Sequence, residues 1–362
     1  MGRTIDLRID VTNAVDLGEP AQIALTVALP DPADLPARPV VCFAKPGGGY
    51  TRHYFTHALP GPGPAAGWRA QADFHVARGW IFVALDHLGS GDGSRHRPEA
   101  LDFGNVTRAA LAAEQEVLLR LANGILASGY PPVLQPVRIG IGQSTGGSLT
   151  IVQQARHDCF DGIGVLGFSA VHSHPASPPG GVPIVTPWFS RDVPPDRPGG
   201  IINAAAVAAA AGEAAQDAAW KALAWGFHYD DVPQDVVEQD LAHYEGIARG
   251  ILAGARPSGE HDPAPWNSYT TPSEATRFTL TPGIVAAEAA AVAVPVLSAM
   301  GERDLVLDPP GEARAFRSAP SFDLFVCPRM GHMHNFAGTR ALFWERIHHF
   351  GEWCAAAKAI EG

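Results

Sequence analysis

Apolar residues along the chain follow two different spacings, which predicts strands and helices in alternation. Polar and apolar residues alternate at 4–11 and 21–29, as in half-buried strands. Short and almost wholly apolar runs then stand at 40–44, 80–85, 137–141 and 163–168. Runs of this kind are typical of strands buried on both faces of a sheet. The intervening segments at 106–127 and about 148–156 have helical spacing, so we expect helices there.

The alternation of predicted strands and helices stops at residue 172 and resumes near residue 289. Strand-like runs return at 294–299 and 323–327, and a closing helix is expected at 340–358. Strands that alternate with helices favour an α/β fold, in which a largely parallel sheet is covered by helices on both faces. We therefore predict a core formed by 1–171 and 289–362, and an inserted cap or lid formed by 172–288.

Composition narrows the class of protein. The chain has 362 residues, of which 46% are hydrophobic and 17% charged, enough to bury a large core. Its net charge of −11 and the absence of a Lys/Arg run argue against nucleic-acid binding. Four cysteines without a Cys-x-x-Cys pair argue against a zinc or redox motif. No apolar segment has the length of a membrane span or signal peptide, so we expect a cytoplasmic protein that does not bind membranes.

The turn Gly142-Gln143-Ser144-Thr145-Gly146 carries the strongest chemical signal. It follows a predicted strand and precedes a predicted helix, which is the context of the G-x-S-x-G nucleophile elbow. Such a sharp turn strains the serine and leaves no room for side chains at the flanking glycines. Ser144 is therefore the candidate nucleophile. The backbone N–H of Thr145, at the start of the helix, is a candidate oxyanion donor.

A second oxyanion donor is expected from the glycine loop after the run at 40–44. The sequence Lys45-Pro46-Gly47-Gly48-Gly49-Tyr50 lets the backbone approach a ligand closely, because no side chain intervenes. Gly48 and Gly49 are both candidates, and the sequence does not choose between them.

A serine nucleophile needs a histidine base and a carboxylate that orients it. His332 follows Gly331 after a late strand and is the favoured base, with His334 as the alternate. Asp304 follows the run at 294–299 and is the favoured carboxylate, with Asp308 as the alternate. The chain order Ser, Asp, His matches this type of triad. A metal-binding His-x-His pair would need further ligands, and we expect no metal.

Taken together, these motifs resemble those of the α/β-hydrolase superfamily. The resemblance covers roughly residues 37–170 and 290–355. It rests on the glycine loop at 46–50, the segment at 85–91, the elbow, the turn at 301–304 and the Gly331-His332 pair. It implies an eight-stranded, mostly parallel sheet, no cofactor and an acyl-enzyme route. The chain departs from the pattern at Lys45-Pro46, where many relatives have His-Gly. A serine at position 144 argues against dehalogenase and epoxide-hydrolase chemistry, which needs Asp there.

We therefore expect a serine hydrolase, with an ester or lactone as the favoured bond. Amide, thioester and carbon–carbon bonds stay open, because one triad serves all of them. Many aromatic residues lie in the insert, among them Trp188, Phe189, Trp220, Trp225, Phe227, Tyr229, Trp266 and Tyr269. They either line a pocket for a bulky, largely apolar small-molecule substrate or form the cap's own core. An acyltransferase and an inactive binding protein are the alternative functions. The sequence decides neither for nor against a homo-oligomer.

Overall fold

The computed structural model describes residues 2–62, 69–181, 184–210, 213–242 and 264–361. Within them, one sheet contains the strands β1 (Arg3–Asp10), β2 (Gln22–Leu29), β3 (Val40–Lys45), β4 (Ile81–Leu85), β5 (Val137–Gln143), β6 (Gly162–Leu166), β7 (Val296–Arg303) and β8 (Phe322–Gly331). The strand order is β1-β2-β4-β3-β5-β6-β7-β8. β2 pairs antiparallel with β1 and β4, and all other pairs are parallel. The predicted α/β fold with an eight-stranded, mostly parallel sheet is confirmed.

The helices are α1 (His53–Thr56), α2 (Gln71–Val76), α3 (Phe103–Ala122), α4 (Thr145–His157), α5 (Ala204–Ala209), α6 (Glu213–Phe227), α8 (Ser273–Arg277), α9 (Ala286–Ala291) and α10 (Arg340–Glu361). Short 3-10 helices occupy Thr12–Ala14, Pro32–Asp34, Pro98–Ala100, Pro309–Arg314 and His334–Phe336. Residues 234–242 are also helical. Among the described helices, none combines the length and the apolar character needed to cross a membrane.

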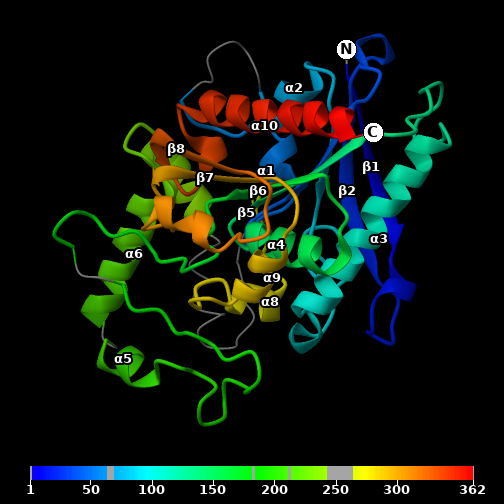
Figure 1. Ribbon diagram of the computed structural model, residues 1–362. Coiled ribbons are helices and arrows are strands. Elements are labelled where there is room, and N and C mark those ends of the chain that lie inside the picture. The colour runs from blue at the N-terminus through cyan, green and yellow to red at the C-terminus, as the bar shows by residue number, and fades with distance from the viewer. Residues whose placement is uncertain (1, 63–68, 182–183, 211–212, 243–263, 362) are drawn as a thin grey trace.

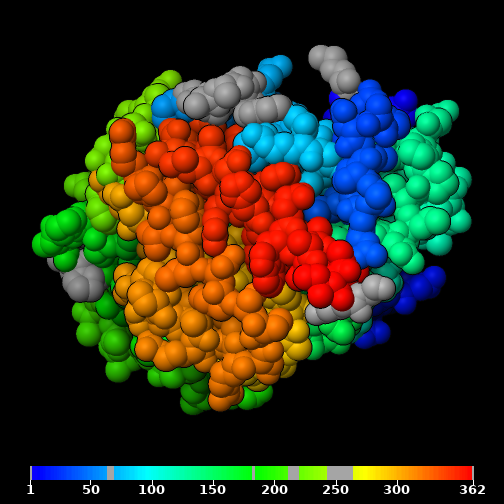
Figure 2. Space-filling model, turned by 45° about the horizontal axis from the view of Figure 1, so that its top comes forward, coloured from blue at the N-terminus to red at the C-terminus, as the bar shows by residue number. Residues whose placement is uncertain are grey.

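Both faces of the central strands are buried, and strand periodicity assigns their residues to two cores. On β3, Val41 and Phe43 join the apolar cluster under α3 and α4, whereas Val40, Cys42 and Ala44 join the cluster under α2 and α10. Successive side chains of a strand point to opposite faces, so a strand buried on both faces must be apolar throughout. α10 lies across one side of the sheet and α3 lies on another side (Figure 1). Figure 2 shows α10 beside the β7–β8 segment on one face of the molecule.

Local signals explain where the long helix α3 differs from its predicted range. It begins at Phe103, because the Asp102 side chain accepts a hydrogen bond from the Asn105 N–H and caps the helix. It ends at Ala122, before Gly124, whose φ of +66° lies in the left-handed region. The predicted range of 106–127 was therefore too late at both ends.

The segment between β6 and β7 contains α5, α6, α8 and α9. In Figure 1, α5 and α6 lie at one end of the molecule, away from β1 and β2. The predicted cap boundary at residue 288 falls inside α9. This helix packs against α4, and Glu288 pairs with Arg156 of α4 at 3.1 Å. α9 thus belongs to the layer that covers the sheet. The division into core and cap stays a prediction.

Candidate active site

Ser144 stands between β5 and α4 in a strained backbone conformation. Its φ is 54° and its ψ is −121°, a region that a residue with a side chain rarely adopts. Close packing enforces the turn. A Cβ at Gly146 would lie 2.6 Å from the Pro46 carbonyl oxygen and still closer to that of Lys45. The Ser144 N–H also donates to the Leu166 carbonyl at 2.8 Å. The sharp turn expected around Ser144 is present, and the residue is half-buried.

Asp304 follows β7 directly and accepts four hydrogen bonds. Its Oδ1 accepts from the Leu305 N–H at 2.7 Å and from His332 Nδ1 at 2.7 Å. Its Oδ2 accepts from the Gly301 N–H at 2.9 Å and from His334 Nε2 at 2.8 Å. Burial alone would raise the pKa of this carboxyl, but the two imidazoles outweigh burial and hold the pKa well below its usual range. Asp304 is therefore an ionised, fully buried anchor for both histidines.

The two candidate histidines occupy different positions around Asp304. His332 Nε2 lies 3.2 Å from the side-chain nitrogen of Gln143, the residue before Ser144, so this ring faces the elbow. His334 packs its ring on Phe343, with 4.3 Å between ring centroids, and its Nδ1 is buried without a partner in the described residues. Burial lowers the pKa of His334, which favours the neutral ring. The sequence treated His334 as a competitor of His332, whereas the structure makes it a second partner of Asp304.

Gln143 contributes a contact that the sequence reasoning missed. Its amide nitrogen donates to the His332 carbonyl oxygen at 3.1 Å, which fixes the orientation of the amide. The same nitrogen therefore faces His332 Nε2 as a donor. With Nδ1–H directed at Asp304, Nε2 carries the lone pair that a general base requires. Within the described residues no hydrogen bond joins Ser144 to His332. Such contacts often form only when substrate binds.

The glycine loop lies over the elbow. A Cβ at Gly47 would be 3.3 Å from Ser144 Cβ, and a Cβ at Gly48 would be 3.1 Å from Thr145 Oγ1. In the described part of the chain, neither glycine N–H donates to another backbone group. Gly49 is one residue farther on, and its carbonyl accepts from the Ser268 N–H at 2.8 Å. Of the two predicted donors, Gly48 lies beside Thr145, whereas Gly49 is engaged with Ser268 instead. Gly47, which the sequence reasoning did not propose, lies closer to Ser144.

The other predicted residues lie outside this cluster. Asp308 is exposed and pairs with Arg314 at 2.7 Å, whereas the buried Asp304 is the carboxylate that bonds to His332. Lys45 does not face the elbow, because its Nζ is buried against Glu114 at 2.7 Å. The carbonyl of the neighbouring Pro46 accepts from His87 Nε2 at 2.7 Å. Burial lowers the pKa of His87 to about 4, so this ring is neutral at pH 7.

Asp304, His332 and His334 also bring their ligand atoms within 4.8 Å of one another. Donors bound to one tetrahedral zinc ion lie about 3.4 Å apart, given bond lengths of about 2.1 Å. Each histidine nitrogen here lies 2.7 or 2.8 Å from its carboxylate oxygen. These are hydrogen-bond distances. These three residues thus fit a hydrogen-bonded cluster around Asp304 better than a metal centre.

A cavity of about 1250 Å³ lies between residues 95–102, 190–196 and 269–278. Neither Ser144 nor His332 lines it. It approaches the site at Thr271, whose Oγ1 would lie 3.4 Å from a Cβ at Gly48. Its lining includes four arginines and six carboxylates: Arg95, Arg97, Arg191, Arg277, Glu19, Glu99, Asp102, Asp192, Asp196 and Glu274. A charged lining favours polar groups at this end of the site.

The aromatic residues of the insert mostly pack elsewhere. Tyr269 is the member of that set that lines the cavity. Phe189, Phe227 and Trp266 are buried in the apolar clusters, and Phe227 packs on His332 with 4.9 Å between ring centroids. Arg303 stacks on Trp225 and Tyr229. These buried aromatics therefore belong to the two clusters that flank the sheet, and neither a separate core of the insert nor an aromatic pocket accounts for them.

No protein-family model and no curated protein matches the chain. Solved structures do. A proline iminopeptidase from Mycobacterium smegmatis aligns with 99% of this chain and 100% of its own, at 15% identity and a TM-score of 0.54. A thermophilic esterase from Thermogutta terrifontis aligns with 96% of this chain and 99% of its own, at 12% identity and a TM-score of 0.54. A haloalkane dehalogenase variant from Bradyrhizobium elkanii aligns with 99% of this chain and 100% of its own, at 14% identity and a TM-score of 0.53. At such identities the likeness concerns the fold, and it confirms what the motifs implied: the chain has the fold of the α/β-hydrolase superfamily.

Proposed function

We propose that the chain is a serine hydrolase that cleaves a carboxylic ester or a lactone through an acyl-enzyme intermediate. The observation that carries the proposal is the strained Ser144 beside a base that is already oriented. His332 donates Nδ1–H to a buried, ionised Asp304 and presents Nε2 toward the elbow. A plain strand-to-helix turn has no need of such a dyad. Solved structures of an esterase and of an N-acyl homoserine lactonase share this fold and support the same chemistry.

In the proposed reaction, His332 Nε2 accepts the Ser144 proton as Oγ attacks the carbonyl carbon. Negative charge develops on the carbonyl oxygen, and the N–H groups of Thr145 and of Gly47 or Gly48 stabilise it. Thr145 is suited to this role because the first N–H groups of a helix have no intrahelical acceptor. His332 then protonates the leaving alkoxide, and water releases the acid by the same steps in reverse. Asp304 stabilises the imidazolium that forms.

Two properties of the substrate are predicted separately: the bond that is cleaved, and the size and polarity of the groups around it. Ester or lactone is the bond we favour among those that a serine triad can cleave, whereas the size and polarity of the substrate depend on what surrounds the triad. A largely apolar substrate stays a prediction. The charged cavity beside Gly48 favours polar groups on the part of the substrate that extends toward Thr271. A panel of p-nitrophenyl esters and simple lactones that differ in charge at one end would separate these expectations.

Covalent labelling with a fluorophosphonate tests the proposal directly. We expect one adduct, mapped to Ser144 and lost in Ser144→Ala. Ser273→Ala is a matched control, because Ser273 also begins a helix but lies outside the cluster of Ser144 and His332. Absence of an adduct on folded protein would refute an activated nucleophile and favour a binding function. Ester product formed from an added alcohol, in excess over free acid, would favour an acyltransferase.

A further inference from the structure

Asp240 is a fully buried carboxylate that the triad does not use. Its Oδ2 accepts from Tyr50 Oη at 2.9 Å and from His228 Nε2 at 2.9 Å, and its Oδ1 accepts from Trp266 Nε1 at 3.0 Å. Its side chain has 0% exposure. Burying a carboxylate is costly unless its oxygens are well satisfied. The three donors come from separate segments, so this carboxylate joins parts of the chain that are far apart in the sequence.

One of those donors belongs to the loop that carries the proposed oxyanion donors. Tyr50 follows Gly49 directly and pairs with Asn267 in an antiparallel bridge. Further bonds run alongside: the Ser268 N–H donates to the Gly49 carbonyl at 2.8 Å, and the Thr51 N–H donates to the Trp266 carbonyl at 2.8 Å. Residues 266–268, from the insert between β6 and β7, therefore form a short ladder with residues 49–51.

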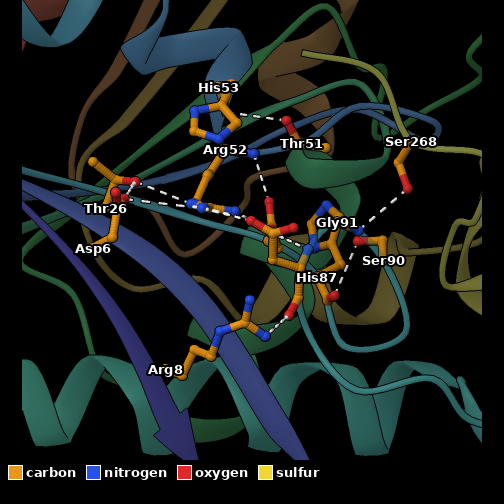
Figure 3. Close-up of polar contacts among 12 residues, drawn as sticks. Asp6, Arg8, Thr26, Thr51, Arg52, His53, His87, Ser90, Gly91 and Ser268 are labelled. Carbon is orange, nitrogen blue, oxygen red and sulfur yellow. Dashed lines mark hydrogen bonds and ion pairs between the residues drawn. The ribbon is translucent and has the colours of Figure 1, made fainter. Parts of the chain in front are cut away.

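The core holds the same loop at its two ends. At the start, His87 Nε2 donates to the Pro46 carbonyl at 2.7 Å. At the end, the Arg52 N–H and guanidinium donate to the two oxygens of Asp86 at 2.7 and 2.6 Å. Figure 3 shows Arg52 and His87 around this loop, together with the bond of 3.2 Å from the Gly91 N–H to Ser268 Oγ. The insert supplies the remaining support, along Gly49 to Thr51.

We propose that Asp240 is a positioning residue of the oxyanion hole, which acts by holding Tyr50 and the 266–268 ladder against the glycine loop. This inference rests on the proposed function and extends it, because it makes the insert a structural part of the hole. Oxyanion donors act only when they are fixed where charge develops, and a displacement of about 1 Å can cost about 100-fold in rate. The hydroxyl of Tyr50 is the link between the carboxylate and the loop.

Two variants test the link, and a third serves as the control. Tyr50→Phe removes one hydroxyl and keeps the ring, and Asp240→Asn keeps the shape of the side chain and removes its charge. Asp235→Asn is the matched control, because Asp235 is exposed on the same helical segment, 234–242. With p-nitrophenyl acetate we expect kcat to fall about 10- to 100-fold in both test variants and KM to change less than about threefold. The double variant should lose no more than the worse single variant.

Two further readouts separate positioning from general damage to the fold. Affinity for phenylboronic acid, whose serine adduct places an oxygen in the hole, should fall by the same factor as kcat/KM. Backbone hydrogen exchange of residues 47–52 should accelerate in the variants, while exchange in α3 stays as in the wild type. Folded variants with wild-type kcat and wild-type exchange in this loop would overturn the proposal. If fluorophosphonates do not label the wild-type protein, the proposed serine hydrolase function fails, and with it the catalytic role of Asp240. The exchange experiment would still decide whether Asp240 holds the glycine loop in place.

Discussion

The shared hydrogen bonding of Asp304 makes a sharp prediction about its two histidines. His334→Phe would keep a ring of similar size against Phe343 and would remove the bond from Nε2 to Asp304 Oδ2. Oδ2 would keep the Gly301 N–H, and Oδ1 would keep both of its donors. The carboxylate would therefore lose one of four partners, and His332 would keep its orientation.

The expected magnitudes follow from what each variant removes. Loss of one charge-assisted hydrogen bond costs about 1.5–3 kcal/mol of stability. Because the base is intact, we expect kcat of His334→Phe to fall about 10-fold or less. His332→Gln removes the base itself and should lower kcat by at least about 1000-fold. His334→Gln, which can still donate to Asp304, should restore most of the stability that His334→Phe loses.

The assay is hydrolysis of p-nitrophenyl acetate together with the rate of fluorophosphonate labelling and urea unfolding of each variant. Urea unfolding shows whether a low rate reflects unfolded protein. If folded His334→Phe loses as much kcat as His332→Gln, the assignment of His332 as base is wrong. If His332→Gln keeps a rate within about 10-fold of the wild type, the triad itself is refuted.

Three further predictions concern the elbow, the carboxylate and pH. Gly146→Ala should lower stability by about 1–3 kcal/mol and slow fluorophosphonate labelling at least about 10-fold, because the new Cβ would clash with the backbone of the glycine loop. A wild-type Tm and a wild-type labelling rate would contradict this. Asp304→Asn should lower kcat about 10⁴-fold, whereas Asp308→Asn should leave it unchanged, as measured with the same ester. The pKa of His87 is about 4 in the folded protein because of burial, below the unfolded value of about 6.5. The unfolded chain therefore binds more protons between these values, and stability should fall as pH decreases from about 6.5 to 4. In His87→Gln, urea unfolding at several pH values should give a slope shallower by up to about 1.4 kcal/mol per pH unit; an unchanged slope would show that His87 does not titrate in this way.

Local patterns were sufficient to predict most of the sheet and the elbow. Each of the central parallel strands β3, β4, β5 and β6 is a short apolar run, because both of its faces are buried, and Ser144 follows such a run directly. β8 extends to Gly331, although its run seemed to end at Cys327. It pairs with β7 up to Arg303 and Gly331, with an irregularity near Gly301. That pairing depends on the neighbouring strand and leaves no signal in the apolar pattern.

The candidate site was predicted only in part, since several of its contacts join distant segments. The order of Ser144, Asp304 and His332 suggested a triad, and the structure brings Asp304 and His332 together. The contact of Gln143 with His332 spans 189 positions, and that of Tyr50 with Asp240 spans 190. No spacing rule relates residues so far apart. The Asn-Gly pair after α3, by contrast, was a visible stop signal that periodicity alone overlooked.

The order of strands in the sheet has a consequence for how the protein would lose its activity on heating. β8 is an edge strand, paired within the sheet only with β7, and it ends directly before His332. Ser144 lies beyond β5, in the middle of the sheet. Edge elements open locally at a lower free energy than the whole molecule unfolds. Fraying of β8 would move His332 away from an undisturbed elbow, so catalytic activity would be lost several degrees below the temperature at which the helices melt. Activity would return on cooling as long as the central strands had stayed paired.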